Sequence, residues 1–131
     1  MKIACIIPSR YASTRLPGKP LRMIARETLV HRVYERAVLA KLPDIVIVAT
    51  DNEKIESEVK SFGGRVMMTS PDHPTGTDRL AEVAASLPDY DIVVNVQGDE
   101  PFINPDVIDS LAKMLAERDD LDMTTAAAPL K

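Results

Sequence analysis

The sequence has no tryptophan, only 4% aromatic residues, one cysteine and two histidines among its 131 residues. Few aromatic side chains and a net charge of −4 leave little for nucleic-acid bases to stack on, so no nucleic-acid partner is expected. Cys5 cannot form an internal disulfide and lies in an apolar run, which predicts a buried, reduced thiol. His31 and His73 are isolated from each other and predict no zinc site, and a structural role is expected for His31.

Long hydrophobic runs are also missing. No apolar stretch approaches the roughly 18 residues that span a bilayer, so no membrane association is expected. The first apolar run begins at Ile3, which leaves no space for a signal peptide, and the expected location is the cytoplasm. The length suits a single globular domain over residues 1–131.

Charge is distributed very unevenly along the chain. Residues 1–41 contain nine Lys and Arg residues against two acidic ones, Glu27 and Glu35, an excess of seven positive charges. Because the whole chain carries −4, the other 90 residues carry an excess of eleven negative charges. This asymmetry predicts an anionic ligand at the N-terminal end of the chain.

Apolar runs and helical stripes alternate along the chain. Buried strands are predicted at residues 3–8 and 45–49, and further strands at residues 66–68, 92–96 and 123–128. Helices are predicted at residues 28–41, 52–62, 77–87 and 105–118. This alternation predicts an α/β fold with a mainly parallel sheet covered by helices on both faces, although the order of the strands is left open.

Residues with capping chemistry mark the ends of these helices. Asp51 or Asn52 is expected to cap the second helix, which ends at Gly63. Thr77 is expected to cap the third, and Asn104 followed by proline at position 105 predicts the start of the fourth.

A polar loop rich in cations follows the first strand. Arg10, Arg15 and Lys19 lie between residues 9 and 20, and arginine forks and lysine ammonium groups both suit phosphate oxygens. The loop has no P-loop or dinucleotide-binding glycine pattern. Considered alone, the three side chains could equally be solvated loop charges.

Polar residues also follow the second and third strands. Thr50 and Asp51 could hydrogen-bond a ligand or simply cap the next helix. The segment 75–79, which includes Arg79, lies at a helix start, where backbone N–H groups favour anions; an ordinary cap is the alternative.

Two adjacent carboxylates, Asp99 and Glu100, follow the fourth strand after Gln97 and Gly98. Mg²⁺ commonly binds proteins through one or two carboxylates together with substrate phosphates, so Asp99 is a candidate magnesium ligand. A simple turn before the next helix is the alternative. In a parallel sheet all four polar segments would line one crevice.

Four stretches together resemble one family, the 3-deoxy-manno-octulosonate (KDO) cytidylyltransferases, or CMP-KDO synthetases. They are residues 6–21, 48–51, 76–82 and 94–101. The resemblance implies a Rossmann-like nucleotidyltransferase fold and transfer of a cytidylyl group from CTP to KDO in lipopolysaccharide biosynthesis. It also implies Mg²⁺ as cofactor and a homodimer for the full-length protein.

The resemblance also implies roles for the basic loop and the metal site. Arg10, Arg15 and Lys19 would hold the triphosphate, and Arg15 and Lys19 would act in catalysis with Asp99. Asp99 would bind Mg²⁺.

The remaining family roles concern the nucleoside and the sugar. Pro8, Thr50 and Asp51 would lie along the cytidine, Gln97 would face the sugar, and Arg79 would help to order the nucleotide or the sugar.

Members of the family are longer than this chain, which is therefore expected to be a truncated, N-terminal part of the fold. Two alternatives stay open. The chain could bind a nucleotide without catalysing transfer on its own, or the sugar could be 8-amino-KDO or another acidic sugar.

Overall fold

A four-stranded parallel sheet forms the centre of the computed structural model, which describes residues 2–9, 19–24, 26–69, 76–96 and 102–117, with the side chains of residues 19 and 76–80 excepted. Its strands are β1 (Ile3–Pro8), β4 (Ile45–Thr50), β5 (Arg65–Met68) and β6 (Ile92–Asn95). They lie in the order β5-β4-β1-β6, and every pairing is parallel. The four predicted strands are confirmed, and the fifth, at 123–128, lies outside the described residues.

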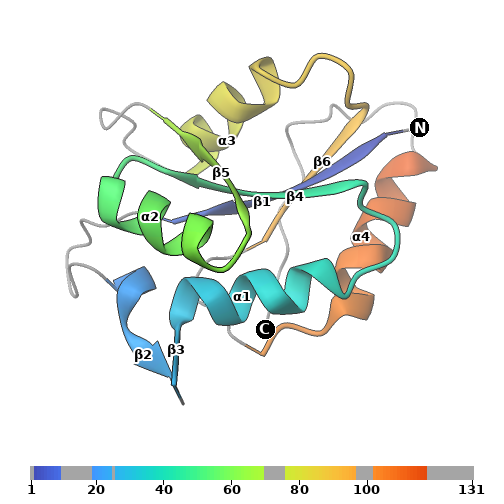
Figure 1. Ribbon diagram of the computed structural model, residues 1–131. Helices are drawn as coiled ribbons and strands as arrows, with labels where there is room; N and C mark the ends of the chain where they lie inside the picture. The colour runs from blue at the N-terminus through green and yellow to red at the C-terminus, as the bar shows by residue number, and fades with distance from the viewer. Residues whose placement is uncertain (1, 10–18, 25, 70–75, 97–101, 118–131) are drawn as a thin grey trace.

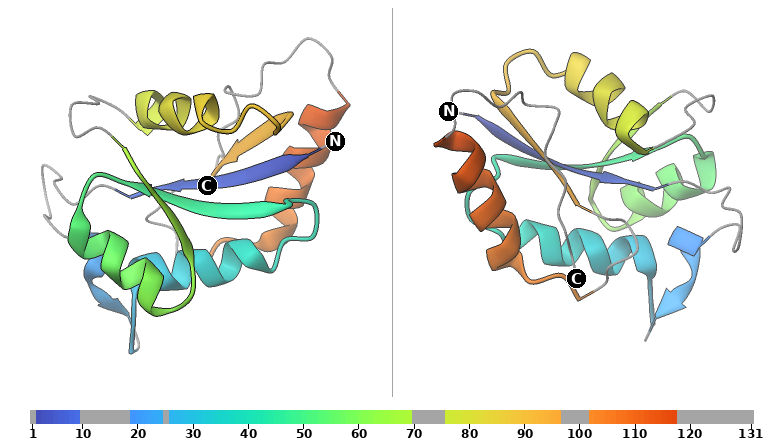
Figure 2. Two further views of the ribbon diagram at one scale, coloured as in Figure 1. Left: turned by 45° about the horizontal axis from the view of Figure 1, so that its top comes forward. Right: turned by 180° about the vertical axis from the view of Figure 1, so that it is seen from behind.

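Four α-helices cover the two faces of this sheet: α1 (Leu29–Val38), α2 (Glu53–Ser61), α3 (Gly76–Ala85) and α4 (Pro105–Ala116). Figures 1 and 2 show α1, α2 and α4 on one face and α3 on the other. The prediction of helices on both faces is therefore confirmed. Within the described residues, no helix is both long and apolar enough to cross a membrane.

The strand side chains alternate between two cores. Cys5 and Ile7 of β1 point into the larger core, which contains the buried side chains of α1, α2 and α4. Ile6 points the other way, into a smaller core where it packs near Val83 of α3. Both faces of β1 are therefore buried, which explains why its sequence is a continuous apolar run rather than an alternating one.

Side-chain caps fix where three helices begin. Thr28 caps α1, Asn52 caps α2, and Asn104 caps α4 with proline following at the first helical position. The backbone of Gly63, after the end of α2, has φ +81°, a conformation in which glycine carries no steric penalty. The predicted caps of α2 and α4 are thus confirmed, with Asn52 rather than Asp51 in the capping position.

The expected start of the third helix is wrong by one residue. The helix α3 begins at Gly76, so Thr77 lies within the first turn and not before it. The helix ends at Ala85 rather than at residue 87, and α1 likewise ends at Val38 rather than at residue 41. Apolar periodicity continues beyond both helices, so it could not define their ends.

Three short elements between β1 and α1 were not predicted. They are the 3-10 helix η1 (Lys19–Leu21) and the strands β2 (Met23–Ile24) and β3 (Glu27–Thr28), which pair antiparallel. Arg26, in the two-residue turn of this hairpin, has φ +81°. Because a glycine or asparagine normally occupies such a position, the hairpin has no sequence signal at its turn.

The amino end of β1 is held by two carboxylates, which lie just before β4 and β6. Asp44 accepts a hydrogen bond from the Ile3 N–H at 2.7 Å, and Asp91 accepts one from the Lys2 N–H at 2.9 Å. These bonds satisfy backbone donors at this edge of the sheet.

Candidate functional site

The carboxyl ends of all four parallel strands meet at one edge of the sheet. Pro8 ends β1, Thr50 ends β4, and Asn95 ends β6. In register, Pro8 pairs with Ala49, and Ile6 pairs with Asn95, so these strand ends are neighbours. Ligands of open parallel sheets bind at this edge, which makes it the candidate site.

Ser9 continues β1 beyond its last paired residue. Its N–H donates to the Ala49 carbonyl at 2.8 Å, which binds the start of the following loop to the end of β4. The residue is only 3% exposed, yet its hydroxyl oxygen has no hydrogen-bond partner within the described structure.

Asn95 presents the same feature at the end of β6. Its side-chain oxygen Oδ1 is buried and has no hydrogen-bond partner within the described structure. The next residue remains attached to the sheet, since the Val96 N–H donates to the Ile6 carbonyl at 2.9 Å. Leaving a buried polar atom unpaired costs about 1–3 kcal/mol, so two such atoms at one edge indicate groups that a ligand or water would satisfy.

Neither Ser9 nor Asn95 was selected as a site residue from the sequence, although both lie in the family motifs. The available signal was their position, since each is a polar residue that directly ends an apolar strand. Nothing in the sequence, however, indicates that their oxygens lack internal partners.

Thr50 holds the turn between β4 and α2. Its side chain is fully buried, and Oγ1 accepts a hydrogen bond from the Asn52 N–H at 3.3 Å. Its carbonyl accepts from the N–H and the hydroxyl of Thr69, at 2.8 and 3.2 Å. Asp51, half-buried, follows at the head of α2. The structure thus brings Pro8, Thr50 and Asp51 to the ends of adjacent strands, with the Thr50 hydroxyl engaged in the turn.

The other predicted site residues are only partly described. Lys19 begins η1, and Arg79 lies near the start of α3, but the side chains of both are outside the described part. Arg10, Arg15, Gln97 and Asp99 lie outside the described residues altogether. The described chain flanks them directly, because residues 10–18 join β1 to η1 and residues 97–101 follow β6 at the candidate edge.

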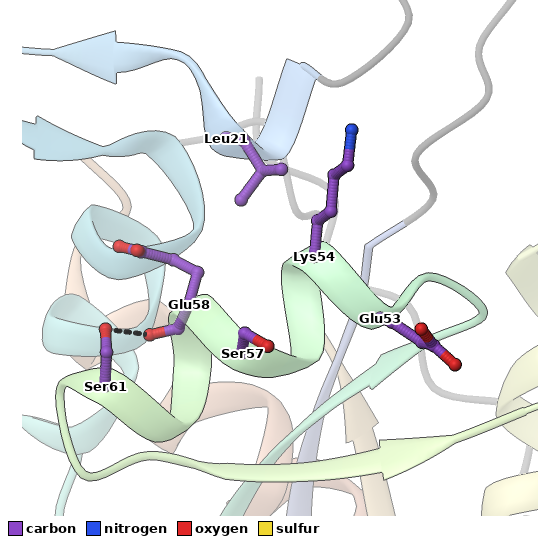
Figure 3. Close-up of a pocket in the computed structure, with 6 residues that line it drawn as sticks. All are labelled: Leu21, Glu53, Lys54, Ser57, Glu58 and Ser61. Carbon is purple, nitrogen blue, oxygen red and sulfur yellow. Dashed lines mark hydrogen bonds between the residues drawn. The ribbon is translucent and has the colours of Figure 1, made fainter.

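A depression of about 580 Å³ lies beside this edge, between η1 and the outer face of α2 (Figure 3). Its lining is Leu21, Glu53, Lys54, Ser57, Glu58 and Ser61. Two glutamates against one lysine make its walls unsuited to a polyphosphate. The depression is therefore not a phosphate pocket.

Cys5 takes no part in this site. The thiol is fully buried in the larger core, and burial raises its pKa from 9.0 to about 12. The prediction of an inert, buried cysteine is confirmed, because the thiolate needed for nucleophilic chemistry is absent near neutral pH.

Comparison with known proteins assigns the chain to a family. The sequence profile of the cytidylyltransferases matches residues 4–131. The chain belongs to the cytidylyltransferase family. Its arrangement of a parallel sheet with helices on both faces is the nucleotidyltransferase fold expected from the sequence.

Two curated cytidylyltransferases illustrate how far the likeness extends. The 3-deoxy-manno-octulosonate cytidylyltransferase of Geotalea daltonii is 56% identical over 131 residues, which cover 100% of this chain and 51% of that protein. The protein of the same name from Leptospira interrogans is 48% identical over 129 residues, 98% of this chain and 52% of its own. The chain therefore spans about half the length of the curated cytidylyltransferases that it matches.

A solved cytidylyltransferase structure agrees with this assignment. It is CMP:2-keto-3-deoxy-manno-octonic acid synthetase complexed with CTP, which superposes with a TM-score of 0.88 at 43% identity. The superposition covers 92% of this chain and 50% of that protein. The strand order and helix placement described above are thus those of an experimentally determined cytidylyltransferase.

Proposed function

We propose that this chain is the CTP-binding part of a CMP-KDO synthetase, which transfers the cytidylyl group of CTP to 3-deoxy-manno-octulosonate for lipopolysaccharide biosynthesis and releases pyrophosphate. The observation that carries the proposal is the match along the whole chain, at 48–56% identity, with KDO cytidylyltransferases. The related synthetase complexed with CTP supports the choice of nucleotide.

Arg10, Arg15 and Lys19 would bind the triphosphate of CTP. Arg10 and Arg15 belong to the segment that leaves the carboxyl end of β1, and Lys19 opens η1 immediately after it. The charge excess of residues 1–41 supports an anionic ligand here. Arginine contributes paired N–H donors to phosphate oxygens, and lysine adds a compact positive charge.

The cytidine would lie across the ends of β1 and β4, along Pro8 and the turn formed by Thr50 and Asp51. Because the Thr50 hydroxyl already accepts a hydrogen bond from the Asn52 N–H, its contribution is to hold this turn in place. Gln97 would face the sugar and Arg79 would order the nucleotide or the sugar.

Asp99 would hold Mg²⁺, with the rest of the metal's ligands supplied by phosphates, waters and parts of the protein beyond this chain. Asn95, which ends β6 at this edge, supports a hard cation here, since its buried Oδ1 has no hydrogen-bond partner in the described structure and Mg²⁺ prefers oxygen ligands. When bound, Mg²⁺ supplies neutralisation of phosphate charge.

The chemistry would be an in-line displacement at the α-phosphorus of CTP by the anomeric hydroxyl of KDO. The bond to the β-phosphate breaks, and pyrophosphate leaves without a covalent enzyme intermediate. Arg15 and Lys19 would stabilise the negative charge that develops on the leaving pyrophosphate. Positioning of the two substrates supplies the rest of the rate enhancement.

The test of this function is CMP-KDO formation from CTP, KDO and Mg²⁺, measured for a full-length relative and for this 131-residue chain. Parallel reactions with 8-amino-KDO and a sialic acid define the sugar, and ATP in place of CTP defines the base. We expect the full-length relative to form CMP-KDO and the 131-residue chain to bind CTP. An absence of any preference for CTP over ATP would contradict the proposal.

The second candidate function is nucleotide binding without transfer, which is favoured by the fact that the chain spans about half of its relatives. CMP-KDO formation by the 131-residue chain on its own would eliminate this candidate. CTP binding without product would support it.

Arg15→Ala tests the triphosphate role directly. Loss of one charge-assisted contact of about 1.5–3 kcal/mol should weaken CTP binding about 10- to 100-fold while leaving CMP binding nearly unchanged. Arg65→Ala is the matched control, since it removes the same charge from an exposed position at the amino end of β5. Calorimetric titration measures both, and equal losses for CTP and CMP would remove Arg15 from the triphosphate.

A further inference from the structure

Three side chains that can bind metal gather where the β2–β3 hairpin meets α1. Glu27 lies in β3, and His31 and Glu35 are four residues apart on one face of α1. One donor atom from each lies within 4.8 Å of the others. This cluster is not part of the candidate CTP site, whose residues come from the loops that follow β1, β4 and β6.

Arg32 orients the first of these ligands. Its Nη1 lies 2.9 Å from Glu27 Oε1, and its Nε donates to the Ile24 carbonyl at 3.1 Å. With Oε1 held in this way, the other oxygen, Oε2, lies 3.4 Å from His31 Nδ1. Hydrogen-bonded neighbours of this kind commonly orient the ligands of metal sites.

The imidazole of His31 is held by packing as well as by the contact of its Nδ1 with Glu27. The ring stacks on Phe62 at the end of α2, with ring centroids 4.0 Å apart and an interplanar angle of 3°. Stacking uses the face of the ring and fixes its plane, whereas the two nitrogen atoms lie at the edge of the ring. The rotamer entropy that a metal ligand normally loses on binding is therefore already lost in part.

The spacing of the donors suits a tetrahedral ion. Zinc bonds of about 2.0–2.2 Å to nitrogen and oxygen place neighbouring ligand atoms roughly 3.3–3.5 Å apart. The 3.4 Å between His31 Nδ1 and Glu27 Oε2 meets this requirement. The Glu35 side chain is 48% exposed and can close the remaining distance by a rotamer change.

The local charge also favours a cation. Glu27 and Glu35 supply two carboxylates, and Arg32 lies 2.9 and 3.9 Å from them. Because the donor atoms of the cluster lie within 4.8 Å of one another, the proximity of the two carboxylates is unfavourable without further positive charge. A divalent ion would relieve this repulsion.

We propose that Glu27, His31 and Glu35 bind one zinc-like transition-metal ion that joins β3 to α1. The imidazole nitrogen selects this class of ion over Mg²⁺ and Ca²⁺, which prefer an all-oxygen environment. The bound ion would fasten the hairpin that follows η1, at a site separate from the Mg²⁺ proposed at Asp99. A water molecule would complete the coordination.

The experiment is calorimetric titration of the metal-stripped 131-residue chain with ZnCl₂, and separately with MgCl₂. His31→Phe removes the nitrogen ligand but keeps a flat ring against Phe62, and Glu35→Gln weakens a second ligand at an exposed position. His73→Ala is the matched control, because His73 is the other histidine of the chain. One zinc per chain is expected, weakened at least tenfold in His31→Phe and measurably in Glu35→Gln, and unchanged in His73→Ala.

Thermal unfolding supplies an independent readout. Zinc should raise the Tm of the wild-type chain and of His73→Ala but not that of His31→Phe, whose Tm in EDTA should match the wild type. If His31→Phe fails to fold, Glu35→Gln carries the test with the same two measurements. Undiminished zinc affinity in whichever of these two variants folds, or its loss in His73→Ala, would overturn the proposal.

Discussion

Thr28→Val removes a hydroxyl that performs two tasks at the start of α1. Its Oγ1 accepts a hydrogen bond from the His31 N–H at 3.3 Å, which caps the helix, and donates to Glu58 Oε2 on α2 at 2.7 Å. Thr28 is buried, at 7% exposure, and valine has the same shape. The substitution therefore removes hydrogen bonding with little change in packing.

The expected loss follows from these two bonds. An N-cap hydroxyl contributes about 1 kcal/mol. The bond to the Glu58 carboxylate contributes about 1 kcal/mol more, below the usual range for a charged acceptor, because Glu58 is half-buried and water can reach it. The free energy of unfolding should fall by about 2 kcal/mol, which moves the urea midpoint down by about 1 M at an m-value of about 2 kcal/mol/M.

A double-mutant cycle separates the two tasks. Urea unfolding of Thr28→Val, Glu58→Ala and the double variant, followed by circular dichroism, should give a coupling energy of about 1 kcal/mol. Thr28→Ser retains the hydroxyl and should lose less stability than Thr28→Val. A coupling energy near zero would show that the 2.7 Å contact between α1 and α2 adds nothing to stability, and the reasoning would fail.

Three further outcomes are expected. Arg26→Gly should stabilise the chain by about 0.5–1 kcal/mol in urea unfolding, because it relieves the positive φ of the β2–β3 turn, whereas Arg26→Ala should not. Cys5 should resist Ellman's reagent at pH 8 until the chain unfolds, and rapid labelling of the native chain would contradict this. Because burial raises the folded pKa of Cys5 from 9.0 to about 12, its contribution to the free energy of unfolding is complete below pH 9 and is lost as the pH rises towards 12. In a full-length relative, the equivalent of Asp99→Asn should abolish Mg²⁺-dependent turnover without changing the circular dichroism spectrum, and near-normal turnover would remove the metal role.

The centre of the sheet could be predicted from the sequence because β1 and β4 are buried on both faces. The runs that contain Ile6 and Val48 are apolar at every position, and side-chain caps such as Asn52 and Asn104 mark the helices between them. These signals are local, so one sequence is enough to read them.

The strand order and the short hairpin could not be predicted in the same way. Placing β1 between β4 and β6 depends on contacts between segments about 40 to 90 residues apart. The hairpin is formed by two-residue strands around Arg26, a residue that does not ordinarily signal a turn.

The candidate site could likewise be predicted only in part. The motifs located Pro8, Thr50 and Asp51, and the structure places all three at the ends of adjacent strands. The unpaired oxygens of Ser9 and Asn95 depend on which neighbours each residue meets after folding. Their lack of partners is a property of packing, which the sequence pattern does not express.

The burial of Cys5 has a practical consequence for spectroscopy. Because the only cysteine of the chain is inert, a new cysteine on the surface can be labelled selectively without first making a cysteine-free variant. Met68, exposed at the carboxyl end of β5, offers a position beside the candidate nucleotide edge, and Leu42, exposed on the connection between α1 and β4, offers a remote reference. A fluorophore at position 68 would report CTP binding by a change in its emission. The same fluorophore at position 42 would reveal changes that do not depend on the site.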